Sequence, residues 1–368
     1  MRDVLRDWDR MTADGSPVGR AVVTKVWGSA PRPAGACLLA DAHGNIAGSV
    51  SGGCVESAAA EEITAAIERG KPRLVSYGVS DEQAWEVGLA CGGTIEVYVE
   101  PAVRQELVDA ARGDGGIVLA TVVEGGPATG WSLVVRDDGT TSGPLPPTGR
   151  GGGGTASNED TQILAGAADQ VSVMAQEALT TNQSRRGTIP TPRGDLDVFF
   201  ELIPRQPRLV IFGGVHVAAP LVTMARALGY RTIVADAREA FLSRERFPDA
   251  DQLVLGWPKA AFAEIGLDPA TFVVVLSHDP KLDDPALEIA LRSPAPYVGA
   301  IGSRKTQNAR RNRLRAAGIS EDQLKRLCGP VGLDLGGREP AETALAILAE
   351  MTAVRYGKAG RQQREKGS

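Results

Sequence analysis

The sequence predicts an α/β protein, with a small α+β domain at the N-terminus and a Rossmann-like doubly wound parallel sheet at the C-terminus. Short apolar runs alternate with helical patterns after residue 206, and strands buried on both faces have this composition. A glycine-rich turn follows the first of these runs, as it does in dinucleotide-binding folds. Before residue 104, short apolar runs and glycine-rich turns surround one helical stretch, which is typical of an α+β layer.

Four segments are expected along the 368 residues. The first domain is followed by an extension, in which a helix precedes two apolar runs that pair as a hairpin across a Gly/Pro-rich turn. The extension also holds a Gly/Pro-rich stretch that buries too little apolar surface to offset its ordering entropy, so a flexible loop is expected there. The segments are residues 1–103, the extension 104–205 with its loop 143–158, the Rossmann-like domain 206–358, and a basic tail 359–368.

The expected elements follow from apolar periodicity and from the turn residues between the runs. In the first domain, strands are expected at 18–26, 36–40, 46–50, 73–77 and 94–99, with a helix at 56–69. In the extension, a helix is expected at 103–112 and hairpin strands at 117–123 and 131–136. In the last domain, strands are expected at 208–212, 231–235, 252–255, 272–276 and 297–301, with a helix at 218–228 that ends at the C-cap residue Gly229.

Composition excludes several classes of protein. A net charge of −5 and a pI near 5.5 argue against a general nucleic-acid binder. Four cysteines are too few for a disulfide framework, and the first ten residues lack the apolar region of a signal peptide. No stretch approaches the roughly 18 apolar residues of a membrane span. We therefore expect a cytoplasmic protein with reduced thiols and no membrane partner.

The first candidate site is the segment 48–56, GSVSGGCVE, between an expected strand and an expected helix. Gly52 and Gly53 allow a sharp turn, and free N–H groups at the start of a helix suit a phosphate or another anion. A cysteine near a helix start is favoured as a thiolate, which is able to ligate a metal ion or contact a sulfur atom. The predicted binding residues are Ser51, Gly52, Gly53, Cys54 and Glu56. The alternative is a tight turn with a small buried cysteine.

A second cysteine also precedes paired glycines, in Cys91, Gly92 and Gly93, just before the expected strand 94–99. If both turns lie at one end of the sheet, Cys54 and Cys91 face one pocket and serve as metal ligands. Two independent turns are the alternative. Neither turn has the spacing of a zinc site.

The turn after the first Rossmann strand contains Gly213, Gly214 and His216, and Asp236 ends the next strand, where a ribose-binding acid belongs. The second fingerprint glycine is replaced by Val215, which weakens the prediction of dinucleotide binding. Because ligands bind outside the carboxyl ends of parallel strands, further cofactor-binding residues are predicted there, namely Arg238, His278, Asp279, Gly302, Ser303 and Arg304. The alternatives are a capped turn before proline for His278 and Asp279, and an exposed helix start for Arg304.

Several long motifs, taken in order, resemble the XdhC/CoxI family. They are GSAPRPAGACLLADAHGNIAGSVSGGCVES (28–57), YGVSDEQAWEVGLACGGTIEVYVEP (77–101), IFGGVHVA (211–218), LSHDPKLDDPAL (276–287), YVGAIGSRKT (297–306) and GPVGLDLGG (329–337). The resemblance covers both end domains and leaves out residues 104–204. The family's Rossmann turn usually reads glycine-alanine-glycine-histidine, so Gly214 and Val215 depart from it and put nucleotide binding in doubt.

The resemblance implies a maturation factor for xanthine dehydrogenase or carbon monoxide dehydrogenase. It implies a chaperone, not an enzyme, that binds molybdopterin or the molybdenum cofactor transiently, protects or helps sulfurate it, and delivers it to the apo-enzyme. The implied partners are the large subunit of a molybdenum hydroxylase, a cysteine desulfurase and a second copy of the chain in a homodimer. Two alternatives stay open: an NAD(P)-dependent oxidoreductase with His278 and Lys281 near the nicotinamide, and a scaffold that only dimerises.

Overall fold

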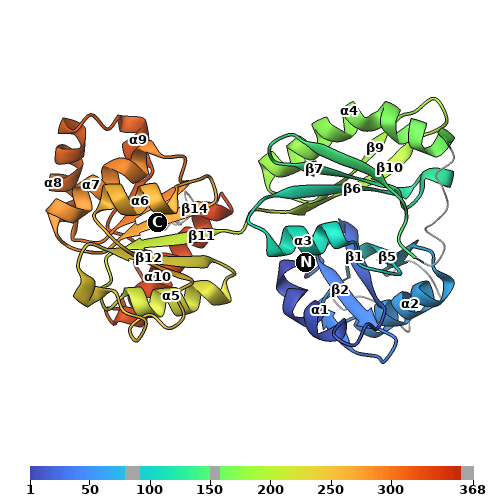
Figure 1. The fold of residues 1–368 in the computed structure, drawn as a ribbon, viewed down its shortest axis with the longest axis horizontal. Coiled ribbons are helices and arrows are strands. Elements are labelled where there is room, and N and C mark those ends of the chain that lie inside the picture. The colour runs from blue at the N-terminus through green and yellow to red at the C-terminus, as the bar shows by residue number, and fades with distance from the viewer. Residues whose placement is uncertain (79–91, 150–157, 358–368) are drawn as a thin grey trace, which may run out of the picture. The chain divides into compact units, whose positions relative to one another are not determined.

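A computed structural model describes residues 1–78, 92–149 and 158–357, with only the helical backbone described for 158–165. The chain forms two compact units, Met1–Arg205 and Gln206–Ser368, each with its own hydrophobic cores. Figure 1 shows the first unit in blue to green and the second in yellow to red. In the described residues, no helix is long and apolar enough to cross a membrane.

The first unit begins with a five-stranded sheet in the order β3-β2-β1-β5-β4, called here the N-terminal sheet. Every neighbouring pair in it is antiparallel. One face packs against helix α2 through a core of small and β-branched side chains. The elements are η1 (Arg2–Val4), α1 (Leu5–Met11), β1 (Val18–Trp27), β2 (Cys37–Asp41), β3 (Ile46–Gly48), α2 (Glu56–Arg69), β4 (Arg73–Tyr77) and β5 (Thr94–Glu100).

The rest of the first unit is a second antiparallel sheet, the middle sheet, in the order β8-β7-β6-β10-β9. Helix α4 covers one of its faces (Figure 1), and the other face shares a core with α1, α3 and the N-terminal sheet. The elements are α3 (Gln105–Arg112), β6 (Ile117–Glu124), η3 (Gly126–Ala128), β7 (Ser132–Arg136), β8 (Thr141–Leu145), α4 (Asn158–Thr181), β9 (Arg185–Ile189) and β10 (Leu196–Ile203).

A buried ion network joins these two sheets. Arg20 on β1 donates to Glu100 on β5 at 2.6 Å and to both carboxylate oxygens of Glu201 on β10 at 2.9 and 2.7 Å. All three side chains are at most 2% exposed. A buried charge without a partner destabilises the folded protein. The network therefore ties the register of one sheet to that of the other.

The second unit is a parallel six-stranded sheet in the order β13-β12-β11-β14-β15-β16, with helices on both faces. The order reverses direction between β11 and β14, as it does in a doubly wound fold. Helices α5 and α10 cover one face, and α6, α7 and α8 cover the other. The elements are β11 (Arg208–Phe212), α5 (Ala218–Ala227), β12 (Arg231–Asp236), η4 (Glu239–Phe241), β13 (Gln252–Leu255), α6 (Pro258–Ile265), β14 (Thr271–Val275), α7 (Pro280–Arg292), β15 (Tyr297–Ala300), α8 (Arg304–Ala316), α9 (Glu321–Lys325), β16 (Leu327–Cys328) and α10 (Pro340–Arg355).

The predicted fold class is confirmed, because the second unit has the parallel Rossmann-type sheet and the chain begins with an α+β layer. The predicted hairpin of the extension is β6 paired with β7. The sequence pattern did not predict α4, β9, β10 or the short strand β16. The predicted start of the Gly/Pro-rich loop, residue 143, was wrong, because residues 143–145 belong to β8.

Candidate functional site

The loop of residues 49–55 connects β3 to α2 and carries Cys54 on its surface. Gly52 and Gly53 have φ angles of 80° and 116°, which only glycine adopts without strain. Cys54 is therefore presented at the outside of a tight turn, in contrast to Cys37, which is fully buried.

Glu56, the first residue of α2, folds back and binds this loop. Partial burial alone would raise the pKa of its carboxyl group, but the hydrogen bonds from Ser49 and Ser51 outweigh burial and lower the pKa to about 2. The carboxylate accepts hydrogen bonds from the hydroxyls of Ser49 and Ser51 (both 2.6 Å) and from the backbone N–H groups of Val50, Ser51, Gly53 and Val55 (2.9–3.2 Å).

The remaining loop amides are bound as well. Gly52 donates to the hydroxyl of Ser49 at 2.8 Å, and Cys54 donates to the hydroxyl of Ser51 at 2.9 Å. The amides that were predicted to bind a phosphate thus already have acceptors within the loop. Ser51 and Glu56 hold the shape of the loop from inside, and the group left for a ligand is the exposed side chain of Cys54.

The second glycine turn lies at the same end of the N-terminal sheet. A Cβ on Gly93 would lie 2.3 Å from the carbonyl oxygen of Ser29, and a Cβ on Gly52 would lie 3.4 Å from the ring of Pro31. Both turns therefore contact the short segment that follows β1. Gly92 is exposed, whereas Cys91, the predicted second metal ligand, lies outside the described residues.

Arg32 is a residue of this site that was not predicted from the sequence, although it belongs to the motif at 28–57. Its Nε donates to the carbonyl oxygen of Ser49 at 3.3 Å, and the side chain is 36% exposed. A guanidinium thus lies against the loop that carries Cys54. An arginine flanked by prolines at 31 and 33 was the available signal, because proline restricts the backbone on both sides.

In the second unit, the glycines of the Rossmann turn are required by neighbouring backbone. A Cβ on Gly213 would lie 2.7 Å from the amide nitrogen of Ser277, and one on Gly214 would lie 2.2 Å from the carbonyl oxygen of Phe241. Val215 packs against the hydrophobic core beside α5, and His216 is exposed. The turn is tight because the loops that contain Gly213, Phe241 and Ser277 meet there.

Asp236 lies at the predicted place, at the end of β12, but it is completely buried. Its carboxylate accepts hydrogen bonds from the amide of Gly214 at 2.8 Å and from the amide, Nε and Nη2 of Arg238, each at 2.9 Å. Burial raises the pKa of Asp236, but these hydrogen bonds exceed that effect and lower it. Both oxygens are thus engaged by protein donors.

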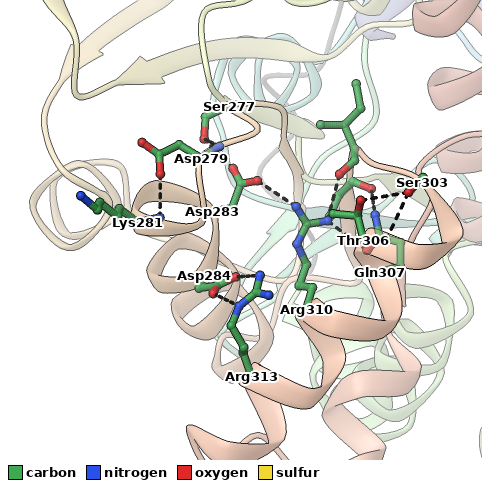
Figure 2. Close-up of polar contacts among 12 residues, drawn as sticks. Ser277, Asp279, Lys281, Asp283, Asp284, Ser303, Thr306, Gln307, Arg310 and Arg313 are labelled. Atoms are coloured by element: carbon green, nitrogen blue, oxygen red, sulfur yellow. Dashed lines mark hydrogen bonds and ion pairs between the residues drawn. The ribbon is translucent and has the colours of Figure 1, made fainter.

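A buried network braces the loops after β14 and β15 (Figure 2). Ser277 donates to Asp283 at 2.5 Å, and Arg310 donates to the other oxygen of Asp283 at 2.8 Å and to the carbonyl oxygen of Ile301 at 2.9 Å. Burial raises the pKa of Asp283 more than the bonds from Ser277 and Arg310 lower it. This pair was not predicted, because Arg310 stands in a run of arginines that is typical of an exposed basic helix.

The other predicted residues of this edge are local structure or exposed. Asp279 caps α7 by accepting from the amide of Lys281, and Ser303 caps α8 by accepting from the amide of Thr306. His278 has a φ of 63° and is exposed, as is Arg304, and Gly302 has a φ of 135°. The structure thus brings the predicted Rossmann residues to the carboxyl edge of one sheet.

The fold and the site define a protein class: a cysteine-bearing antiparallel unit joined to a Rossmann-type unit. The model of the XdhC and CoxI family matches residues 11–78, and that of the XdhC Rossmann domain matches residues 209–351. The chain therefore belongs to the XdhC and CoxI family.

Two curated proteins are similar over most of their length. A protein of Bacillus subtilis named as a probable subunit of xanthine dehydrogenase is 25% identical, over 94% of this chain and 96% of that protein. The molybdenum cofactor insertion chaperone PaoD of Escherichia coli is 26% identical, over 96% of this chain and 88% of that protein. A crystal structure described as a xanthine dehydrogenase from Bacillus halodurans shares the fold, with a TM-score of 0.70 at 24% identity, covering 99% of this chain and 97% of that one.

Proposed function

We propose that the protein is a molybdenum cofactor chaperone that holds the cofactor at the Cys54 end of the N-terminal sheet and delivers it to a molybdenum hydroxylase. The name of PaoD supports a role in cofactor insertion, and the name of the Bacillus subtilis relative supports a xanthine dehydrogenase as the target. One observation carries the proposal: an exposed thiol stands on a loop whose own polar groups are already satisfied.

The residues of this end of the sheet fit such a cargo. A thiolate at Cys54 is a soft donor suited to molybdenum or to a sulfur on it, and Cys91 takes part in the same role. Arg32 offers the planar donor set that binds phosphate, and it replaces the loop amides as the anchor for the phosphate of the pterin. Bound cofactor would supply the molybdenum centre that the target enzyme needs.

The finer parts of the proposal concern its partners. The recipient is the large subunit of the hydroxylase, and a cysteine desulfurase supplies the sulfur for the sulfurated cofactor. The chaperone works as a homodimer in the cytoplasm. We also propose that the Rossmann unit binds a nucleotide, or the nucleotide tail of a dinucleotide cofactor, at the carboxyl ends of β11, β12 and β14.

Cofactor transfer tests delivery directly. Protein co-expressed with the cofactor pathway is purified without oxygen and mixed with apo-hydroxylase of the xanthine dehydrogenase type, and enzyme activity is followed over time. We expect activity to appear with the wild-type protein and to be strongly reduced with Cys54→Ser or Arg32→Met. If both variants activated the enzyme as fast as the wild type, delivery through this site would be refuted.

A further inference from the structure

The end of the second Rossmann strand distinguishes two kinds of nucleotide. A free carboxylate there accepts a hydrogen bond from the 2′-hydroxyl of an unphosphorylated ribose, whereas a nearby arginine accommodates a 2′-phosphate. Asp236 is 0% exposed and already accepts from Gly214 and Arg238. It therefore has little capacity left for a ribose hydroxyl.

Arg238 is fixed in place at this position. One edge of its guanidinium is bound by Asp236, and its plane lies over the ring of Phe241 at 3.9 Å from the ring centre. The side chain is 36% exposed, and no residue in the described part of the chain accepts a hydrogen bond from its Nη1. A guanidinium held on two sides loses little entropy when it binds a phosphate.

The neighbouring strand end supplies a surface for a base. The amide of Gly256 donates to the backbone oxygen of Asp236 at 3.0 Å, so the ends of β12 and β13 lie side by side. Trp257 follows directly and is 60% exposed. An exposed indole is a stacking platform for a nucleobase. A phosphate-binding group and a base-stacking group thus follow two neighbouring strand ends.

We infer that the Rossmann unit selects nucleotides that carry a phosphate on the ribose 2′-oxygen, and that Arg238 binds this phosphate. The inference rests on the proposal that this unit binds a nucleotide.

Calorimetric titration of the full-length protein with NADP⁺ and NAD⁺ tests the inference, because these probes differ only in the 2′-phosphate. We expect NADP⁺ to bind at least about tenfold more tightly, as one charge-assisted contact provides. Arg238→Ala should remove this preference by weakening NADP⁺ alone, and Arg238→Lys, which keeps the charge beside Asp236, should retain part of it. Trp257→Ala should weaken both nucleotides alike. Arg226→Ala, an exposed arginine on α5, is the matched control and should change neither.

Three results would overturn the inference in distinguishable ways. Equal binding of the two nucleotides, or tighter binding of NAD⁺, would refute the role of Arg238 while nucleotide binding by the unit stands. A preference for NADP⁺ that survives in a folded Arg238→Ala protein would assign the phosphate to another residue. Binding of neither probe would refute the nucleotide proposal, and the inference with it, and would leave the Cys54 site untouched.

Discussion

Ser51 binds Glu56 twice, through its backbone N–H at 2.9 Å and through its hydroxyl at 2.6 Å. The same hydroxyl accepts a hydrogen bond from the backbone amide of Cys54 at 2.9 Å. A chain of hydrogen bonds therefore runs from the carboxylate at the start of α2 to the backbone of the exposed cysteine. The position of the Cys54 thiol thus depends on a carboxylate that is bound within the loop.

Removing this carboxylate should loosen the loop. Glu56→Gln keeps the size of the side chain but replaces one acceptor oxygen with a donor group, which faces the loop's own donors. We expect a loss of about 1 kcal/mol in the free energy of unfolding, and faster reaction of Cys54 with a disulfide reagent. Glu61→Gln, on the exposed side of the same helix, is the control. Unchanged thiol reactivity in Glu56→Gln would show that the carboxylate does not hold the loop.

The pH dependence of the loop follows from the lowered pKa of Glu56. Its folded pKa of about 2 lies below the ordinary 4.5, so its contribution to stability is full above about pH 4.5 and is lost as the pH falls towards 2. Carbon NMR of the labelled carboxyl group should show a titration midpoint near 2. A midpoint near 4.5 would mean that the hydrogen bonds to the loop are not formed in solution.

Arg20 should be one of the most sensitive positions in the first unit. Arg20→Ala leaves the buried carboxylates of Glu100 and Glu201 without their shared cation, and we expect a loss of about 3–5 kcal/mol in urea unfolding. Arg10→Ala, which removes an exposed ion pair with Asp7, should cost less than about 1 kcal/mol. If Arg20→Ala does not fold, Arg20→Met combined with Glu100→Gln and Glu201→Gln should restore folding. Near-wild-type stability of Arg20→Ala would contradict the network.

Two neighbouring ion pairs between α7 and α8 offer a matched comparison (Figure 2). Asp283 and Arg310 are at most 3% exposed, whereas Arg313, the partner of Asp284, is 43% exposed. Asp283→Asn should cost about 3–5 kcal/mol and Asp284→Asn less than about 1 kcal/mol. In a double-mutant cycle of Asp283→Asn with Arg310→Met, the two losses of unfolding free energy should be strongly non-additive. Equal costs for the two pairs would refute the bracing role of Asp283.

The sequence predicted the first five strands of the second unit well because each is defined locally. The strand β11 and the strand β13 have the predicted bounds, since their apolar runs are bordered by turn residues. Strand β9 was missed because it is short and polar, and it is held by pairing with β10. Such pairing depends on tertiary context, which a local pattern does not contain.

The sequence named most residues of the candidate site but not the contacts that the structure gives them. A carboxylate in a glycine-rich loop can bind either the loop's own amides or a ligand. The residue type alone does not distinguish these two roles. Glu56 and Asp236 both turned out to satisfy protein donors. The role of Arg20 was not visible because its partners lie 80 and 181 residues away in the sequence.

The central claim, that Cys54 holds the cofactor, is tested most directly by the molybdenum and pterin content of protein purified without oxygen after co-expression with its target. Cys328→Ser, at a half-buried thiol of the second unit, is the matched control. We expect wild type and Cys328→Ser to carry both components, and Cys54→Ser and Cys54→Ser/Cys91→Ser to lose them while staying folded. Full molybdenum and pterin in the double-serine protein would contradict the claim.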